Sequence, residues 1–185
     1  LGLKASGRVD MIENMVNNFS HLINTVGFIP NGNRTYYLGR SQPPFYSLMV
    51  QLLVEIKGKN VLMEYLPTLQ AEYNYWMKGA EELNSSSNAV YHVVKMKDGE
   101  LLNRYCDAFE TARPESYKED VELTHQSLQE ASVLYKHLRA GAESGWDYSS
   151  RWFKDGQSFS TIHTTDIVPV DLNCLLYHLE QDRKS

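Results

Sequence analysis

The sequence has few of the features that mark several classes of protein. It contains 2 cysteines, Cys106 and Cys174, which is too few for a disulfide-rich scaffold, and their spacing is not that of a metal cluster. They can be two free thiols or one bridge. No apolar run approaches the ~20 residues of a membrane span, and no run is rich in Lys and Arg. The net charge is −5, from 18 basic and 23 acidic residues. Neither a membrane nor nucleic acid is therefore an expected partner.

What the sequence does contain is an ordinary globular composition with many aromatic residues. The 185 residues are 42% hydrophobic and 22% charged, enough for one domain with a sizeable core. Aromatic residues make up 11%, including 12 Tyr, which favours a ligand groove or a thick core. The first residues lack both an initiator Met and the form of a signal peptide. The compartment is therefore unknown, and both periplasm and cytoplasm are possible for a soluble protein.

Apolar residues recur at helical spacing along most of the chain. The first helix has Gly27 in its C-cap region, the second has Ser41 as a possible cap and ends at Gly58, and Ser116-Tyr-Lys-Glu119 is a capping box for the fourth. The fourth helix has a possible break near Ser127. The predicted helices are Met11–Ile23, Ser41–Ile56, Asn60 to about Leu83, Ser116 to about Ala142, and Val170–Leu179.

One short segment has a strand pattern. Val90 to Leu102 predicts a β-hairpin with Asp98-Gly99 as its turn. We interpret 31–40, 84–88 and 103–114 as loops or irregular chain, and 161–168 as extended. The chain is thus mostly α, with helix–loop units that alternate as in helical toroids or solenoids and a small inserted β-hairpin.

Two polar loops carry side chains suited to a polyhydroxylated ligand. The segment from Asn31 to Gln42 contains two Asn, two Arg and a Gln, and amides and guanidinium groups form hydrogen bonds of fixed direction. Its alternative role is to cap the flanking helices. In Arg113-Pro-Glu-Ser-Tyr117, proline stiffens the backbone, so Arg113 and Glu115 would point in fixed directions. These two can bind hydroxyls or simply pair with each other.

A third loop combines a carboxylate with aromatic rings. Asp147 lies among Trp146, Tyr148, Trp152 and Phe153, with Arg151 nearby and Gly145 permitting a close approach of the backbone. Aromatic faces suit the C–H faces of a sugar. A carboxyl beside apolar rings is poorly solvated as an anion, which favours the protonated form that a general acid needs. The alternative is a surface Asp on a packed turn after a helix. In a helical toroid all three loops would gather at one end and form a cleft.

Five blocks of this sequence, in order, resemble α,α-trehalase, the family 37 glycoside hydrolases. They are Pro30-Asn-Gly-Asn-Arg-Thr-Tyr-Tyr37, Arg40-Ser-Gln-Pro-Pro44, Arg113-Pro-Glu-Ser116, Ala140-Gly-Ala-Glu-Ser-Gly-Trp-Asp147 with Ser149-Ser-Arg-Trp152, and Ile167-Val-Pro-Val-Asp-Leu-Asn173. The resemblance implies an (α/α)6 toroid that hydrolyses trehalose to two glucose molecules with inversion. It implies Asp147 as the general acid, and no cofactor or metal. It also implies a set of sugar-binding residues: Asn31, Arg40, Ser41, Gln42, Arg113, Glu115 and Gly145.

The sequence departs from the family pattern at both ends. The family carries an upstream Arg-Phe…Trp-Asp segment that lines the glucose site and a downstream Glu that is the general base, and neither is present. Residues 1–185 therefore resemble an internal part of a trehalase catalytic domain. Inverting hydrolysis needs a second carboxyl, and although Glu115 is conceivable, the resemblance makes it a sugar ligand. We expect this chain alone to be inactive, and to self-associate through exposed helix faces.

Other functions are compatible with the same loops. The chain can be a non-catalytic carbohydrate-binding module that uses all three loops without cleaving the sugar. It can also be a purely structural helical interaction module in which the loops only cap helices. Maltose phosphorylases and glucoamylases, which share the toroid, are a weaker enzyme alternative because they lack the Asn-Gly-Asn-Arg block.

Overall fold

The computed structural model describes residues 1–84 and 86–184. The chain forms two compact units. Unit 1 contains Leu1–Ile29, Pro44–Trp76 and the chain from Cys174 onward, and unit 2 contains Pro30–Pro43 and Met77–Asn173. All three loops singled out in the sequence belong to unit 2.

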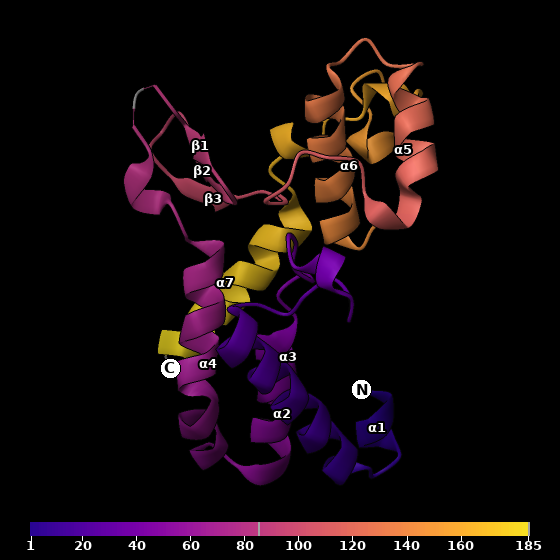
Figure 1. Cartoon of the computed structure of the whole chain (residues 1–185). Helices are drawn as coiled ribbons and strands as arrows, with labels where there is room; N and C mark the ends of the chain where they lie inside the picture. Colours follow the sequence, from indigo (N-terminus) through magenta and orange to yellow (C-terminus); the bar gives the residue numbers. More distant parts are fainter. Residues whose placement is uncertain (85, 185) are drawn as a thin grey trace. The chain divides into compact units, whose positions relative to one another are not determined.

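Unit 1 is built from helices that pack on one another. After the short α1 (Gly2–Ala5) come α2 (Val9–Val26), α3 (Tyr46–Lys57) and α4 (Asn60–Trp76), each of which contacts the other two (Figure 1). The helix α7 (Val170–Lys184) contributes its residues from Cys174 onward. The helices predicted here are confirmed, and Gly27 ends α2 in the left-handed conformation at φ 95°. Among the described residues no helix is long and apolar enough to cross a membrane.

The core of unit 1 is formed by one apolar face of each helix, and on α3 this face is centred on Tyr46, Val50 and Leu53 rather than on Phe45 and Leu48, which are exposed. Its buried apolar side chains come from α2, α3, α4 and α7: Ile12, Val16, Ile23, Tyr46, Val50, Leu53, Tyr65, Leu69, Trp76, Leu176 and Leu179. Buried hydroxyls have partners, as expected for polar groups removed from water. Tyr46 hydrogen-bonds the Ser20 hydroxyl at 2.6 Å, and Tyr65 donates to the Asn17 side chain at 2.7 Å.

Three sequence predictions about element ends are wrong. Ser41 caps no helix, because α3 begins only at Tyr46 after the Pro-Pro pair, and Phe45 is its N-cap. Helix α4 ends at Trp76 rather than at Leu83, because the chain turns through Gly79 in the left-handed region at φ 86°. The segment 161–168 is not uniformly extended, since Thr164–Asp166 forms a 3₁₀ turn.

The described residues of unit 2 include a small sheet, the helices α5 and α6, and the first turn of α7. The strands β1 (Ala89–Val90), β2 (Val93–Lys95) and β3 (Leu101–Asn103) are antiparallel in the order β1-β2-β3, with Val90 opposite Val93 and Val94 opposite Leu102. The predicted hairpin is confirmed as β2–β3 with Asp98-Gly99 in its turn, and β1 is an additional strand that the sequence did not predict. Ser85, in the predicted loop before it, lies outside the described residues.

The helices of unit 2 are α5 (Tyr117–Thr124) and α6 (Ala131–Ser144), which contact each other. The break predicted near Ser127 is therefore confirmed. Gln129 stabilises the break by donating to the carbonyls of Ser160 and Ile162. Ser116 is the N-cap of α5, as predicted, but its side chain makes no capping hydrogen bond. The capping-box sequence therefore predicts where this helix begins, although its side-chain hydrogen bond is not made.

One buried carboxyl makes the stability of unit 1 depend on pH. Glu72 on α4 is 2% exposed, and within the described residues its Oε2 has no hydrogen-bond partner. Burial raises the pKa of Glu72 from 4.5 to about 8, because an unpaired anion is poorly stabilised away from water. The folded protein therefore keeps this proton over a pH range in which the unfolded chain has lost it.

We predict that the free energy of unfolding falls as pH rises from about 4.5 to 8, by on the order of 1 kcal/mol per pH unit from this group. The contribution is complete below the unfolded pKa and is lost as pH rises through the folded pKa. Glu72→Gln, which stays neutral, should flatten this slope in urea unfolding at several pH values. Glu64→Gln, an exposed change on the same helix, is the control; an unchanged slope in the Glu72 variant would contradict the prediction.

Candidate active site

The loop of residues 30–43 is closed by its own hydrogen bonds. Pro30 pairs with Ser41 in an isolated antiparallel bridge, and the Asn31 N–H donates to the Arg40 carbonyl at 3.1 Å. The Asn31 side-chain amide donates to the carbonyls of Ser41 and Ala142, at 3.3 Å each. Gln42 donates to the Asn31 carbonyl at 2.8 Å. Asn31 thus fixes its own loop and ties it to the last turn of α6.

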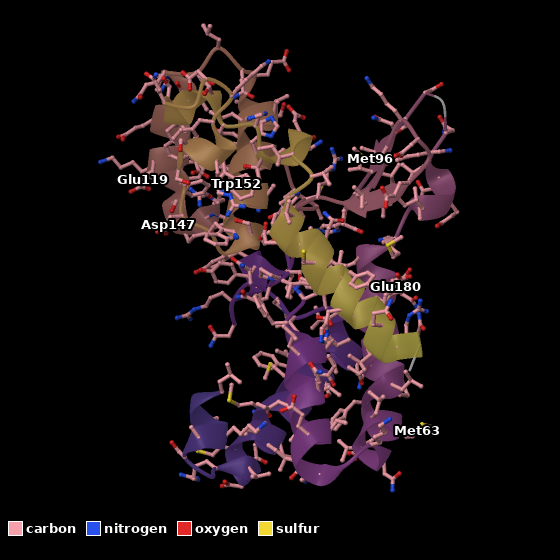
Figure 2. All side chains as sticks on the ribbon, turned by 180° about the vertical axis from the view of Figure 1, so that it is seen from behind. Met63, Met96, Glu119, Asp147, Trp152 and Glu180 are labelled. Atoms are coloured by element: carbon pink, nitrogen blue, oxygen red, sulfur yellow. The ribbon has the colours of Figure 1, made fainter. Side chains whose placement is uncertain are left out.

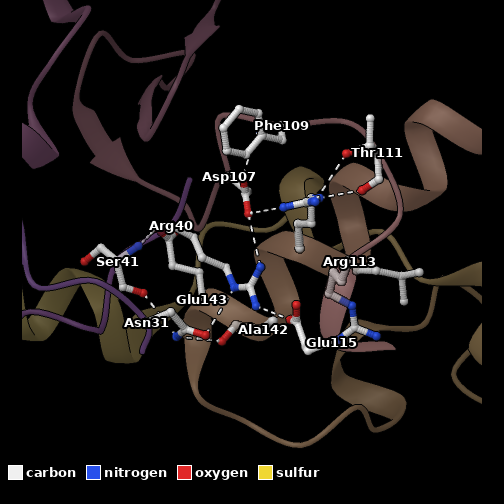
Figure 3. Close-up of polar contacts among 12 residues, drawn as sticks. Asn31, Arg40, Ser41, Asp107, Phe109, Thr111, Arg113, Glu115, Ala142 and Glu143 are labelled. Carbon is white, nitrogen blue, oxygen red and sulfur yellow. Dashed lines mark hydrogen bonds and ion pairs between the residues drawn. The ribbon is translucent and has the colours of Figure 1, made fainter. Parts of the chain in front are cut away.

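Arg40 is the charged centre of this loop, and its side chain is 1% exposed. Its Nε donates to the Asn31 side-chain oxygen at 3.1 Å, and its Nη1 lies 3.4 Å from Asp107 Oδ2. Its Nη2 forms a short contact with the carboxylate of Glu115. Figure 3 shows these contacts converging on one guanidinium group. Arg139 binds the same Asp107 oxygen at 3.1 Å.

Arg113 lies in a second ion pair of the same unit. It binds Asp120, in the first turn of α5, through both its side chain and its backbone N–H, with Nη2 at 2.6 Å from Oδ1. Its Nη1 donates to the Tyr148 hydroxyl at 2.7 Å. Arg113 and Glu115 therefore do not pair with each other: each takes a partner from elsewhere in the chain, and their separate orientations are fixed.

Glu143 joins three segments through one fully buried carboxylate. Its Oε1 accepts from the backbone N–H of Ser41 at 2.9 Å, and its Oε2 accepts from the backbone N–H of Cys106 at 2.7 Å. Both oxygens lie within 3.1 Å of His92 Nε2. Burial, with the charge of Glu143 as a further cause, raises the pKa of the Cys106 thiol to about 11. Cys106 is therefore held as a protonated thiol and is not a nucleophile.

The loop that carries Asp147 begins where α6 ends. Gly145 ends the helix in the left-handed conformation at φ 70°, and the Trp146 N–H donates to the Ser144 hydroxyl at 3.1 Å. On the other side of Asp147, the Tyr148 ring packs on Gly141, where a Cβ would lie 2.5 Å from the ring. Only glycine fits there. Burial raises the pKa of Tyr148 to about 12, so its hydroxyl stays neutral.

Asp147 itself is exposed, and it makes no hydrogen bond or ion pair within the part of the chain that the structure describes. The prediction that neighbouring rings would bury this carboxyl is wrong for this chain, because Trp146 beside it is itself 51% exposed. Figure 2 labels Asp147 among the side chains near α5 and α6. A free carboxyl on a well-anchored loop is suited to exchanging a proton with a bound molecule.

The structure brings most of the predicted site residues together. Asn31, Arg40 and Glu115 are joined by direct contacts. Ser41 and Gln42 belong to the same closed loop, and Arg113 reaches the residue that follows Asp147. Gly145 faces Pro43, with the nearest atom 3.9 Å from a Cβ built on the glycine.

Sequence reasoning missed the buried charges that hold these residues in place: Asp107, Asp120, Arg139 and Glu143. No pattern in the sequence marked them as buried. Arg139 and Glu143 lie four residues apart on α6 and share one face of this helix, but Leu134 and Leu138 lie on another face. An Arg–Glu pair at this spacing is as common on exposed helix faces, so the spacing alone does not indicate burial.

A mostly helical chain whose interhelix loops hold fixed polar side chains and an exposed carboxyl is organised in the way expected of helical-toroid carbohydrate enzymes. Comparison with known proteins identifies the family, since the trehalase family model matches residues 1–184. The chain belongs to the trehalase family.

Similar proteins include the periplasmic trehalase of Xanthomonas campestris pv. campestris (strain B100), which is 53% identical over 98% of this chain and 32% of that protein. The periplasmic trehalase of Pseudomonas aeruginosa is 53% identical over 98% of this chain and 33% of that protein. Among solved structures, neutral trehalase Nth1 from Saccharomyces cerevisiae matches with a TM-score of 0.73 and 25% identity, over 98% of this chain and 34% of that one. The predicted (α/α)6 fold class is thereby confirmed. The chain spans about a third of the length of these relatives.

We predict that Glu143→Gln lowers the free energy of unfolding by about 3 kcal/mol. Whichever carboxylate oxygen becomes an NH₂ group, the N–H of either Ser41 or Cys106 then faces a donor instead of an acceptor. Chemical unfolding measures the loss. Glu130→Gln, an exposed change just before the same helix, should have little effect; equal stability of the two variants would show that Glu143 does not hold these segments.

Proposed function

We propose that the complete protein hydrolyses α,α-trehalose to two glucose molecules with inversion, and that Asp147 is its general acid. The observation that carries the proposal is the state of Asp147: exposed, free of partners among the described residues, and flanked by residues that are both anchored. Membership of the trehalase family supports the reaction. Protonation of the glycosidic oxygen requires a carboxyl that is not already bound to a cation.

We propose Asn31, Arg40, Ser41, Gln42, Arg113, Glu115 and Gly145 as the sugar-binding residues of this unit. The exposed fractions of these side chains suggest two roles, contact with the sugar and orientation of the residues that contact it. The side chain of Glu115 is 21% exposed and that of Arg40 is 1% exposed, so Glu115 is available to hydroxyl groups while Arg40 mainly orients it. Arg113 is 8% exposed and orients Tyr148. Buried charges that fix exposed polar groups preorganise a site for a ligand rich in hydroxyls.

The second carboxyl of an inverting mechanism, the general base, is proposed to lie outside residues 1–185. Apart from Asp147, the carboxylates described here around the site have partners: Asp107 and Glu115 bind Arg40, Asp120 binds Arg113, and Glu143 accepts two backbone N–H groups. A carboxylate so engaged is poorly placed to activate water. We therefore interpret residues 1–185 as part of a trehalase catalytic domain.

The compartment of the complete protein is a further proposal. Several relatives carry the name periplasmic trehalase, which supports a periplasmic location. Fractionation of cells that express the complete protein tests it: recovery in the cytoplasmic fraction alone would contradict this location.

We predict that Asp147→Asn in the complete protein lowers trehalose turnover by at least about 10³-fold while binding remains within about threefold, because the amide cannot donate the proton. Glucose release measures turnover, and calorimetry measures binding. Glu119→Gln, an exposed change on α5, is the control and should be fully active.

The outcomes separate three functions. A carbohydrate-binding module would bind trehalose without turnover in either form, and a structural module would not bind it. The 185-residue chain alone should release no glucose, and turnover by it would contradict the proposed position of the base.

We also propose that unit 1 self-associates when the 185-residue chain is studied alone. Its exposed apolar side chains include Met11, Met15, Phe45, Leu48 and Met63, and exposed apolar area of this kind favours association. Sedimentation should show dimers or larger species that dissociate on dilution. Met11→Gln together with Met15→Gln should weaken the association, whereas a monomer at every concentration would contradict it.

A further inference from the structure

A second group of contacts surrounds the loop that carries Asp147, and it centres on the carboxylate of Asp171. Asp171 Oδ2 accepts from the indole N–H of Trp146 at 2.8 Å and from the Tyr105 hydroxyl at 2.9 Å. Its Oδ1 accepts from Arg151 Nη2 at 3.3 Å. From these contacts we infer that Asp171 is a positioning residue for the general acid, acting through Trp146. The inference rests on the proposed function of Asp147.

Asp171 holds Trp146 in two ways. It fixes the edge of the indole directly, through the N–H. It also holds Arg151, whose guanidinium carbon lies 4.4 Å from the centre of the Trp146 ring. A side chain held at both its edge and its face has little rotational freedom, although Trp146 is half exposed. A residue of this exposure would otherwise sample several rotamers.

The residues that surround and carry Asp171 are firmly packed. Tyr105 is 1% exposed and Trp152 is 1% exposed, and their rings pack edge to face with centroids 6.4 Å apart. Asp171 lies in the first turn of α7, where a carboxylate is favoured by the helix dipole. That turn is tied to β3 by Asn173, which accepts from the Asn103 N–H and donates to the Asn103 carbonyl, both at 2.8 Å.

Because Asp147 has no partner of its own among the described residues, its direction depends on the two residues beside it. Tyr148 is fixed by Arg113 and by its packing on Gly141. Trp146 is fixed by Asp171 and Ser144. Releasing Trp146 removes one of two supports of the acid. A displacement of about 1 Å at a catalytic group can cost on the order of 10²-fold in rate.

The experiment compares Asp171→Ala, which removes both acceptor oxygens, with Trp146→Phe and the double variant in the complete protein. Trp146→Phe removes the indole N–H and keeps an aromatic ring for Arg151. With trehalose we expect each single variant to lower kcat by about 10- to 100-fold with KM within about threefold, because the acid is misplaced for the transition state. The double variant should be little worse than the poorer single one, since both break the same contact. Asp166→Asn, an exposed change five residues earlier, should be fully active.

A second substrate separates positioning from a general structural role. Fluoride is a good leaving group, so cleavage of glucosyl fluoride needs far less help from a proton donor than cleavage of trehalose does. Turnover of glucosyl fluoride should therefore fall by less than about threefold in the same variants. Equal losses on both substrates, or additive effects in the double variant, would overturn the inference, as would full activity on trehalose. If Asp171→Ala unfolds at the assay temperature, Trp146→Phe alone decides. An active Asp147→Asn variant would instead overturn the proposed function.

Discussion

The arrangement of the candidate site depends on one buried carboxylate, that of Glu143. It accepts the N–H groups of Ser41 and Cys106 and contacts His92 from within α6, so it joins the 30–43 loop, the chain after β3 and the helix that leads to Asp147. Removing a carboxylate from water is costly, and the cost is offset only when its lone pairs are occupied. The geometry is therefore strict, because a shift of any of the three segments would leave a buried charge short of a partner.

Around this carboxylate, three buried or partly buried arginines each face a carboxylate of unit 2. Arg40 faces Glu115, Arg139 faces Asp107, and Arg113 faces Asp120. Such pairs contribute little net stability compared with an apolar core of the same volume, but they fix direction, since a guanidinium group binds through N–H groups in a rigid fork. The polar side chains of the candidate site are therefore held in fixed orientations by their partners.

Much of the helical framework could be predicted from the sequence, because apolar spacing and glycine positions depend on neighbours a few residues away. The stripes of α2 and α4 and the left-handed Gly27 are of this kind. The partners of charged side chains could not be predicted, because they depend on contacts distant in sequence. Arg113 and Glu115 are two residues apart, yet one binds Asp120 and the other Arg40. The burial of Asp147 was misjudged for the same reason: adjacent aromatic residues need not cover a carboxyl, and Trp146 instead turns its indole N–H to Asp171.

Under the proposed function, in which Asp147 is the general acid, the contrast between Asp147 and the other carboxylates of the unit gives a reason for the firm hold on its neighbours. A general acid has to be free to give up its proton, so it cannot be fixed by a cation of its own without losing the protonated form. Its position must then come from the backbone, and the backbone is held through the aromatic residue on each side. Tyr148 is fixed by packing on a glycine that admits no Cβ, and Trp146 is fixed by a carboxylate that is itself paired. Both supports act on its neighbours and leave Asp147 without a contact of its own, so they constrain where the carboxyl lies without occupying its oxygens.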